Sequence, residues 1–193
     1  LPGTLSPLGK EQAVVLAEQL KQEPLDVIVC SDLARSYDTA KVVAGYHGKQ
    51  PQPTPLLREM DWGIYTGETL EDVDWEHLPP GVESVDELYH RAGEFVNYLR
   101  VKYAGKCILA VGHGAFNRAI LTYLNGGYRR SSLLYASASS VGIHRKNPCR
   151  SSNERERLHG WSQLGHRDRY AVRHWLVSMA TSDDGCQSFL DAG

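Results

Sequence analysis

The chain has 193 residues, 41% of them hydrophobic and 23% charged, with a formal net charge of −2. These values are ordinary for a globular domain with a substantial core, and the charge gives no reason to expect nucleic acid as a partner. No apolar run approaches the ~20 residues that cross a membrane, and the first residues lack the pattern of a signal peptide. We therefore expect one cytoplasmic domain over residues 1–193, without a membrane contact and present as a monomer or homodimer.

Helical and strand patterns alternate from the first residues onward. Helices are predicted over residues 6–22, 33–47, 84–103 and 115–127, and strands over 25–32, at the start of 55–63 and over 105–114. Ser6 is placed to cap the first helix, with Pro7 in its first turn. This alternation predicts a three-layer α/β/α fold with a mostly parallel central sheet.

Four cysteines, Cys30, Cys107, Cys149 and Cys186, lack the spacing of metal ligands. Cys30 and Cys107 fall within apolar strand-like runs, where a free thiol packs as a small hydrophobic group. The sequence thus predicts reduced thiols and no metal site.

Three polar residues follow predicted strands. Arg35 lies one turn into the helix after residues 25–32, Glu59 ends "LLRE", and His113 ends "ILAVGH". Each has a plain structural interpretation, as a helix-surface charge, a solvated loop acid and a capping histidine. Together they lie where α/β sheets place their sites, and Gly112 and Gly114 would let the backbone approach a ligand closely.

Several stretches resemble a known family in order. They are "LSPLGKEQA", "SDLARSYDTA", "LREMDWGIYTGET", "PPGVESVDELYHR" and "ILAVGHGAFNRAIL". As a set, from Leu5 to Leu124, they resemble the histidine phosphatase (phosphoglycerate mutase-like) superfamily. The resemblance implies that Arg35 clamps a phosphate, that Glu59 is the general acid, and that His113 is the second, charge-stabilising histidine.

The family opens with a strand ending in Arg-His-Gly, whose histidine is the nucleophile, and we expect that segment to be missing ahead of Leu1. Near the other end, "RDRYAVRH" is an apolar stretch that runs into Arg173 and His174. We therefore expect a circular permutation, with the remaining family blocks in residues 1–166 and the relocated first strand and its loop in residues 167–193. On this hypothesis Arg173 binds phosphate and His174 is the nucleophile.

The alternative is a truncated or aberrant chain without a working nucleophile. Trp175 stands where the family has glycine beside the phosphate, and Val177 and Ala180 stand where it has threonine and asparagine. The first hypothesis predicts an active enzyme, whereas the second predicts a phosphate-binding pseudoenzyme of the same fold.

The residue types suit phosphoryl transfer. A neutral imidazole can attack phosphorus to form a phosphohistidine, arginine holds the anion, and a carboxylic acid protonates the leaving group. None of these steps needs a metal or a cofactor. Mutases of this family carry long insertions, for which the 54 positions from Glu59 to His113 leave little room. We expect a metal-independent phosphomonoesterase acting on a small phosphorylated metabolite.

Four further residues lie in the blocks that resemble the family. Glu83 and Arg91 match its Gly-Glu-Ser…Arg block, and we interpret Glu83 as structural rather than catalytic. Trp62 and Tyr65 follow Glu59 closely and could either stack on the organic part of a substrate or belong to the core.

Overall fold

The structure is a computed structural model that describes residues 3–68, 73–124, 126, 142–146 and 173–178. Its helices are α1 (Pro7–Leu20), α2 (Ala34–Tyr46), α3 (Val85–Lys102) and α4 (Gly114–Leu124), with short 3₁₀ helices η1 (Pro55–Leu57) and η2 (Gly63–Tyr65). Its strands are β1 (Val27–Ser31), β2 (Gln52–Thr54), β3 (Cys107–Gly112), β4 (Gly142–Lys146) and β5 (Arg173–Ser178).

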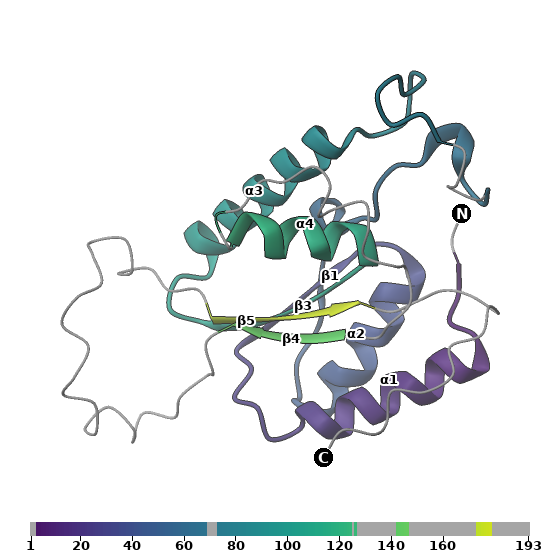
Figure 1. Cartoon of the computed structure of the whole chain (residues 1–193). Coiled ribbons are helices and arrows are strands. Elements are labelled where there is room, and N and C mark those ends of the chain that lie inside the picture. The colour runs from purple at the N-terminus through teal and green to yellow at the C-terminus, as the bar shows by residue number, and fades with distance from the viewer. Residues whose placement is uncertain (1–2, 69–72, 125, 127–141, 147–172, 179–193) are drawn as a thin grey trace, which may run out of the picture.

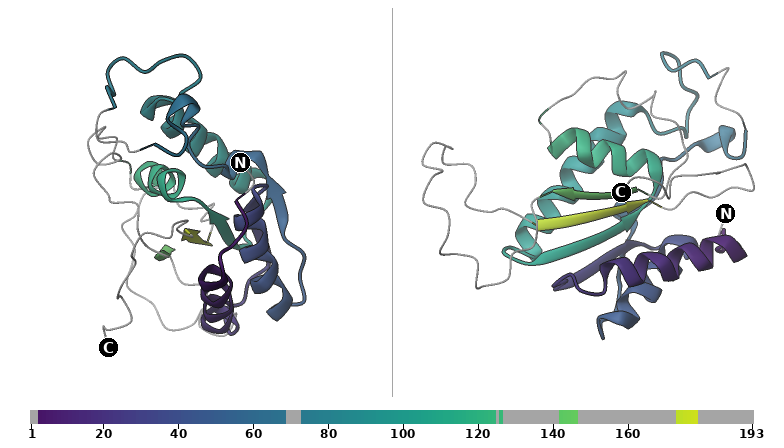
Figure 2. Two further views of the ribbon diagram at one scale, coloured as in Figure 1. Left: turned by 90° about the vertical axis from the view of Figure 1, so that its right-hand side faces the viewer. Right: turned by 60° about the horizontal axis from the view of Figure 1, so that its bottom comes forward.

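The five strands form one sheet in the order β2-β1-β3-β5-β4. Neighbouring strands run parallel except β4, which is antiparallel to β5. Helices α3 and α4 cover one face of the sheet, and α1 and α2 cover the other (Figures 1 and 2). The predicted three-layer α/β/α fold with a mostly parallel sheet is therefore confirmed.

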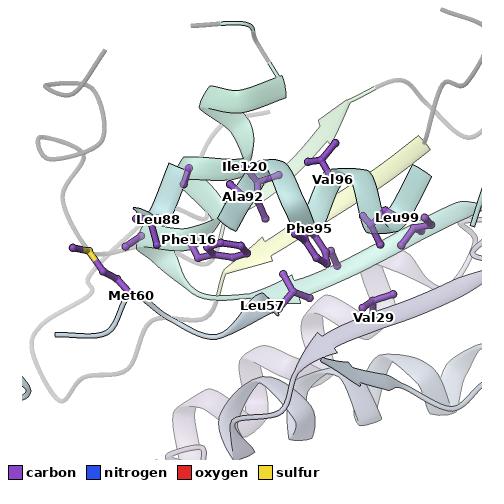
Figure 3. Packing of buried hydrophobic residues seen from close by; sticks show 14 of the residues in the cluster. Val29, Leu57, Met60, Leu88, Ala92, Phe95, Val96, Leu99, Phe116 and Ile120 are labelled. Carbon is purple, nitrogen blue, oxygen red and sulfur yellow. The ribbon is translucent and has the colours of Figure 1, made fainter. Parts of the chain in front are cut away.

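Two hydrophobic cores flank the sheet. In β1, Val29 points into the core under α3 and α4, while Ile28 and Cys30 belong to the core under α1 and α2. Because both faces are covered, β1 is apolar up to its last residue, Ser31, and β3 is apolar throughout, rather than alternating. Figure 3 shows the first core, where Phe95 of α3 and Phe116 of α4 pack edge to face with ring centroids 6.1 Å apart.

Local sequence signals place the helix starts correctly. The hydroxyl of Ser6 accepts a hydrogen bond from the amide of Gly9 at 3.1 Å, as a cap of α1 should. Helix α3 begins with a capping box, in which the side chains of Ser84 and Glu87 each bind the other's backbone amide.

The strand predicted at the start of residues 55–63 is wrong. Residues Pro55–Leu57 form η1, and the strand is β2, which ends one residue earlier at Thr54. Pro55 lacks an amide donor for a sheet, and the Thr54 hydroxyl instead caps η1 by accepting from the amide of Leu56 at 3.3 Å.

The sequence predicts a strand near the C-terminus that runs into Arg173 and His174. Both residues lie in β5, which continues to Ser178, whereas the part of the predicted strand before Arg173 lies outside the described residues. Residues 147–172 and 179–193 lie outside the described part of the chain. The boundary predicted after residue 166, between the family blocks and the relocated strand, lies there too.

The cysteine expectation holds in part. Cys30 is free and buried, and burial raises the pKa of its thiol to about 12, so that it stays protonated. Cys107 is disulfide-bonded, which overturns the prediction of a free thiol there. Among the helices that the structure describes, none combines the length and apolar character that crossing a membrane requires.

Candidate active site

The site lies where β1 and β3 end. Ser31 is the last residue of β1 and leads into α2, while Gly112 ends β3 and is followed at once by His113. The buried hydroxyl of Ser36 donates to the carbonyl of Val111 at 2.7 Å, which fixes the start of α2 against the end of β3. Parallel strands therefore bring Arg35 and His113 to the same edge of the sheet.

A cavity of about 990 Å³ opens at this edge, and Arg35 and Glu59 both line it. Other lining residues are Arg58, Asp61, Trp62, Glu83, Glu87 and Arg91. Arg58 is neutralised by a two-pronged ion pair with Asp32, at 2.8 and 2.6 Å, which also lowers the pKa of Asp32. This pair joins the ends of β1 and η1, so that the loop carrying Glu59 is held against the sheet.

The carboxylate of Glu59 lies at the N-terminus of α4. It accepts hydrogen bonds from the amides of Met60 at 2.9 Å, Phe116 at 3.3 Å and Ala115 at 3.5 Å. The first amides of a helix have no acceptor within the helix, so they can donate to the oxygens of this side chain. The side chain of Glu59 is therefore fixed in one place and oriented by α4.

Two arginines stand near Glu59 with unused hydrogen-bonding capacity. Burial lowers the pKa of both Arg35 and Arg118, and the charge of Glu59 opposes that shift in each. Within the described residues the buried Nε atoms of both arginines lack a hydrogen-bond acceptor. A bound oxyanion would supply such acceptors in the geometry that guanidinium groups favour.

His113 is buried, with 1% of its surface exposed, and its Nε2 has no hydrogen-bond partner in the part of the chain that the structure describes. Burial lowers its pKa to about 3, helped by the positive charges of Arg35 and Arg91 and opposed by Asp32. Before an anion binds, the imidazole is therefore neutral at neutral pH.

This neutral burial predicts how stability depends on pH. On unfolding, the imidazole of His113 returns from a pKa of about 3 to its ordinary 6.5, so the unfolded chain binds more protons between these values. The stability that it contributes is complete above pH 6.5 and is lost as the pH falls, by roughly 2–3 kcal/mol at pH 4.5, at about 1.4 kcal/mol per pH unit. Urea unfolding of His113→Gln at pH 7 and pH 4.5 should show a correspondingly smaller difference than the native chain.

His90→Gln is the matched control, because His90 is 80% exposed on α3. It should keep the native pH dependence. An unchanged dependence in His113→Gln would show that the buried imidazole does not take up a proton on unfolding.

The structure brings together three of the five predicted site residues. Arg35 and Glu59 share the cavity, and His113 is buried close enough to Arg35 for their charges to interact. Arg173 and His174 pair in register with Cys107 and Ile108, at the start of β3. His113 lies five residues further along, about 16 Å at the usual rise per residue. The register thus places the backbones of His174 and His113 at opposite ends of the sheet.

Sequence reasoning missed Arg118, whose signal is a charged residue among the buried residues of α4, such as Ala119 and Ile120. Trp62 packs against the core, edge to face on Trp75 with ring centroids 6.1 Å apart, and it also lines the cavity; its stacking on a substrate stays a prediction. Among the described residues, no group of three or more histidine, cysteine or carboxylate side chains is arranged to hold a metal ion.

Several known proteins resemble this chain. Phosphoserine phosphatase 1 of Hydrogenobacter thermophilus is 31% identical over 136 residues, which cover 63% of this chain and 64% of that protein. An acid phosphatase of Mycobacterium tuberculosis is 33% identical over 150 residues, covering 72% of each chain. The matched part of the chain therefore spans somewhat less than two thirds of the length of the first relative and somewhat more than two thirds of the second.

Solved structures agree with these relatives. A mycobacterial glucosyl-3-phosphoglycerate phosphatase superposes with a TM-score of 0.59 at 26% identity, covering 69% of this chain and 72% of that one. The sequence model described as histidine phosphatase superfamily (branch 1) matches residues 3–152. The motifs, the fold and these matches agree, and the chain belongs to the histidine phosphatase superfamily.

Proposed function

We propose that this protein is a metal-independent phosphomonoesterase that hydrolyses a small phosphorylated metabolite through a phosphohistidine. One observation carries the proposal: Arg35 and Glu59 line one cavity at the carboxyl end of the sheet, beside a buried His113 whose Nε2 has no partner among the described residues. These groups provide a cation for the phosphoryl oxygens, a carboxyl group for the leaving oxygen, and an imidazole for the same anion.

The proposed reaction has two steps. A histidine nitrogen, predicted from the sequence to be that of His174, attacks phosphorus, the bond from phosphorus to the ester oxygen breaks, and the Glu59 carboxyl group gives its proton to the departing alcohol. Water, deprotonated by the Glu59 carboxylate, then attacks the phosphorus of the phosphohistidine, the bond from phosphorus to nitrogen breaks, and inorganic phosphate and the free histidine are released. Arg35 and His113 stabilise the charge on the phosphoryl oxygens in both steps.

The relatives support a monoester substrate without fixing its organic part. Their names include phosphoserine phosphatase and glucosyl-3-phosphoglycerate phosphatase, whose substrates share the phosphomonoester and differ elsewhere. Trp62 in the cavity wall offers an aromatic surface for the organic part of the substrate.

A second candidate is a protein of this fold that binds phosphate but does not hydrolyse phosphomonoesters. The register of β5 favours it, because the backbone of the predicted nucleophile His174 lies opposite Ile108 rather than near His113. Trp175, which stands where the family has glycine, also favours the phosphate-binding protein.

Turnover of p-nitrophenyl phosphate by the full chain in EDTA tests the proposal. We expect turnover that His113→Ala abolishes and that His77→Ala, at a histidine with 82% exposure, leaves unchanged. Quenching with an alkaline denaturant after addition of labelled substrate should trap a phosphohistidine, which is stable in base and lost in acid, and peptide mapping at alkaline pH identifies the residue that carries it. Loss of turnover and of that label in His174→Ala would identify His174 as the nucleophile.

The remaining outcomes separate the two candidates. A chain that binds vanadate but shows no turnover would overturn the enzyme proposal in favour of the phosphate-binding protein. A chain that neither binds vanadate nor turns over substrate would overturn both.

A further inference from the structure

Arg91 of α3 makes an unusual number of contacts for one side chain. Its Nε and Nη2 donate to the two carboxylate oxygens of Glu83 at 2.8 and 2.7 Å, a two-pronged pair whose side chains are 19% and 13% exposed. Such a pair fixes the plane of the guanidinium group as well as its position. The remaining donors of Arg91 are thereby held in one direction.

Those donors serve the loop that carries Glu59. Nη1 donates to the carbonyls of Leu56 at 3.0 Å and Arg58 at 2.9 Å, and Nη2 reaches the carbonyl of Glu59 at 3.4 Å. Residues just after η1 are outside any helix or strand, so their carbonyls need partners from elsewhere. Arg91 is that partner for three carbonyls in and after η1.

Glu83 binds the backbone that follows Glu59. Its carboxylate accepts from the amide of Asp61 at 3.1 Å, and its own amide donates to the carbonyl of Asp61 at 2.7 Å. The Glu83–Arg91 pair therefore fixes the backbone both before and after Glu59.

Arg91 also contacts the helix that receives the Glu59 carboxylate. Its guanidinium carbon lies 4.1 Å from the centre of the Phe116 ring, and the amide of Phe116 donates to Glu59. One side chain thus touches the backbone of Glu59 and one of the residues that orient its carboxyl group.

We propose that Arg91, held by Glu83, is a positioning residue that sets the Glu59 carboxyl group against the leaving oxygen of the substrate. This inference rests on the proposed function, because it assigns Arg91 a part in the same proton transfer. It assigns Arg91 no contact with the reacting atoms. Lysine cannot replace it, since an ammonium lacks the planar fork that reaches a carboxylate and three carbonyls together.

The test compares two substrates in the full chain. An alkyl phosphate leaves as a poor anion that needs a proton, whereas p-nitrophenolate leaves readily without one. Arg91→Lys should lower kcat for the alkyl phosphate by about 10- to 100-fold, as expected for a slightly misplaced acid. It should leave KM near the native value and change kcat for p-nitrophenyl phosphate by a few-fold at most.

Controls separate positioning from plain destabilisation. Arg100→Lys, at an exposed arginine in the last turn of α3, should match the native chain on both substrates. Glu83→Gln should repeat the selective loss more weakly, and it stands in for Arg91→Lys if that variant does not fold. Equal losses on both substrates, or no loss, in the folded variant would contradict the proposal.

The two proposals fail in distinguishable ways. If Glu59→Gln shows no preference between the substrates, the assignment of the acid is wrong. If Glu59→Gln is selective and Arg91→Lys is not, only the positioning role of Arg91 is wrong.

Discussion

Replacing Arg35 with alanine is expected to lower kcat/KM for phosphomonoesters by about 100- to 1,000-fold, the usual cost of removing one stabilising donor from a transition state. Arg35 lines the cavity and its buried Nε has no acceptor among the described residues, so a phosphoryl oxygen is the partner that it is placed to take. Steady-state kinetics with p-nitrophenyl phosphate, together with vanadate binding by calorimetry, measure the effect.

Two further variants complete the Arg35 experiment: Arg35→Lys as the conservative replacement and Arg100→Ala as the control. Lysine keeps the charge but loses the fork, so we expect an intermediate loss. Arg100 is exposed on α3, and its replacement should change neither kinetics nor binding. Native vanadate affinity in Arg35→Ala would show that the anion binds elsewhere.

Replacing Glu59 with glutamine is expected to slow hydrolysis of an alkyl phosphate by about 100- to 10,000-fold, the range for loss of a general acid. Glutamine keeps an oxygen that can accept from the amides of Met60 and Phe116, so the loop and α4 should stay in place. Hydrolysis of p-nitrophenyl phosphate should fall far less, because its leaving group needs no proton. The ratio of the two kcat values is the measurement.

Glu94→Gln is the matched control for Glu59, since Glu94 is 57% exposed on α3. It should leave the ratio of the two kcat values unchanged. An equal loss on both substrates in Glu59→Gln would assign Glu59 to holding the site together rather than to proton transfer.

The features that could be predicted from the sequence depend on neighbours along the chain. Ser6 and Ser84 cap helices through residues three positions away, and the apolar runs of β1 and β3 identify buried strands directly. Once strands and helices alternate, the ends of parallel strands share an edge. That rule predicts that Arg35 and His113 lie close together, whereas Glu59 reaches the same edge through η1, which follows β2.

The features that could not be predicted depend on distant partners. The local sequence of β5 does not determine which residue of β3 it pairs with, and only the register of the two strands puts His174 opposite Ile108. The disulfide of Cys107 could not be predicted either, because sequence alone does not determine cysteine pairing.

The role of Arg91 is a further case of distant partners. Its three carbonyl acceptors lie more than 30 positions earlier in the chain. The sequence indicates a structural role for Glu83, and its contacts with Arg91 and Asp61 agree with that role. No local sequence pattern indicates the hydrogen bonds from Arg91 to the loop that carries Glu59.

The most direct test of this account is the position of orthovanadate in a crystal of the full chain. We expect the vanadate in the cavity at the ends of β1 and β3, with its oxygens within hydrogen-bond distance of the Arg35 guanidinium and of His113 Nε2. Vanadate bound away from both groups, with neither of them in contact with the anion, would contradict the assignment of this cavity as the phosphate site.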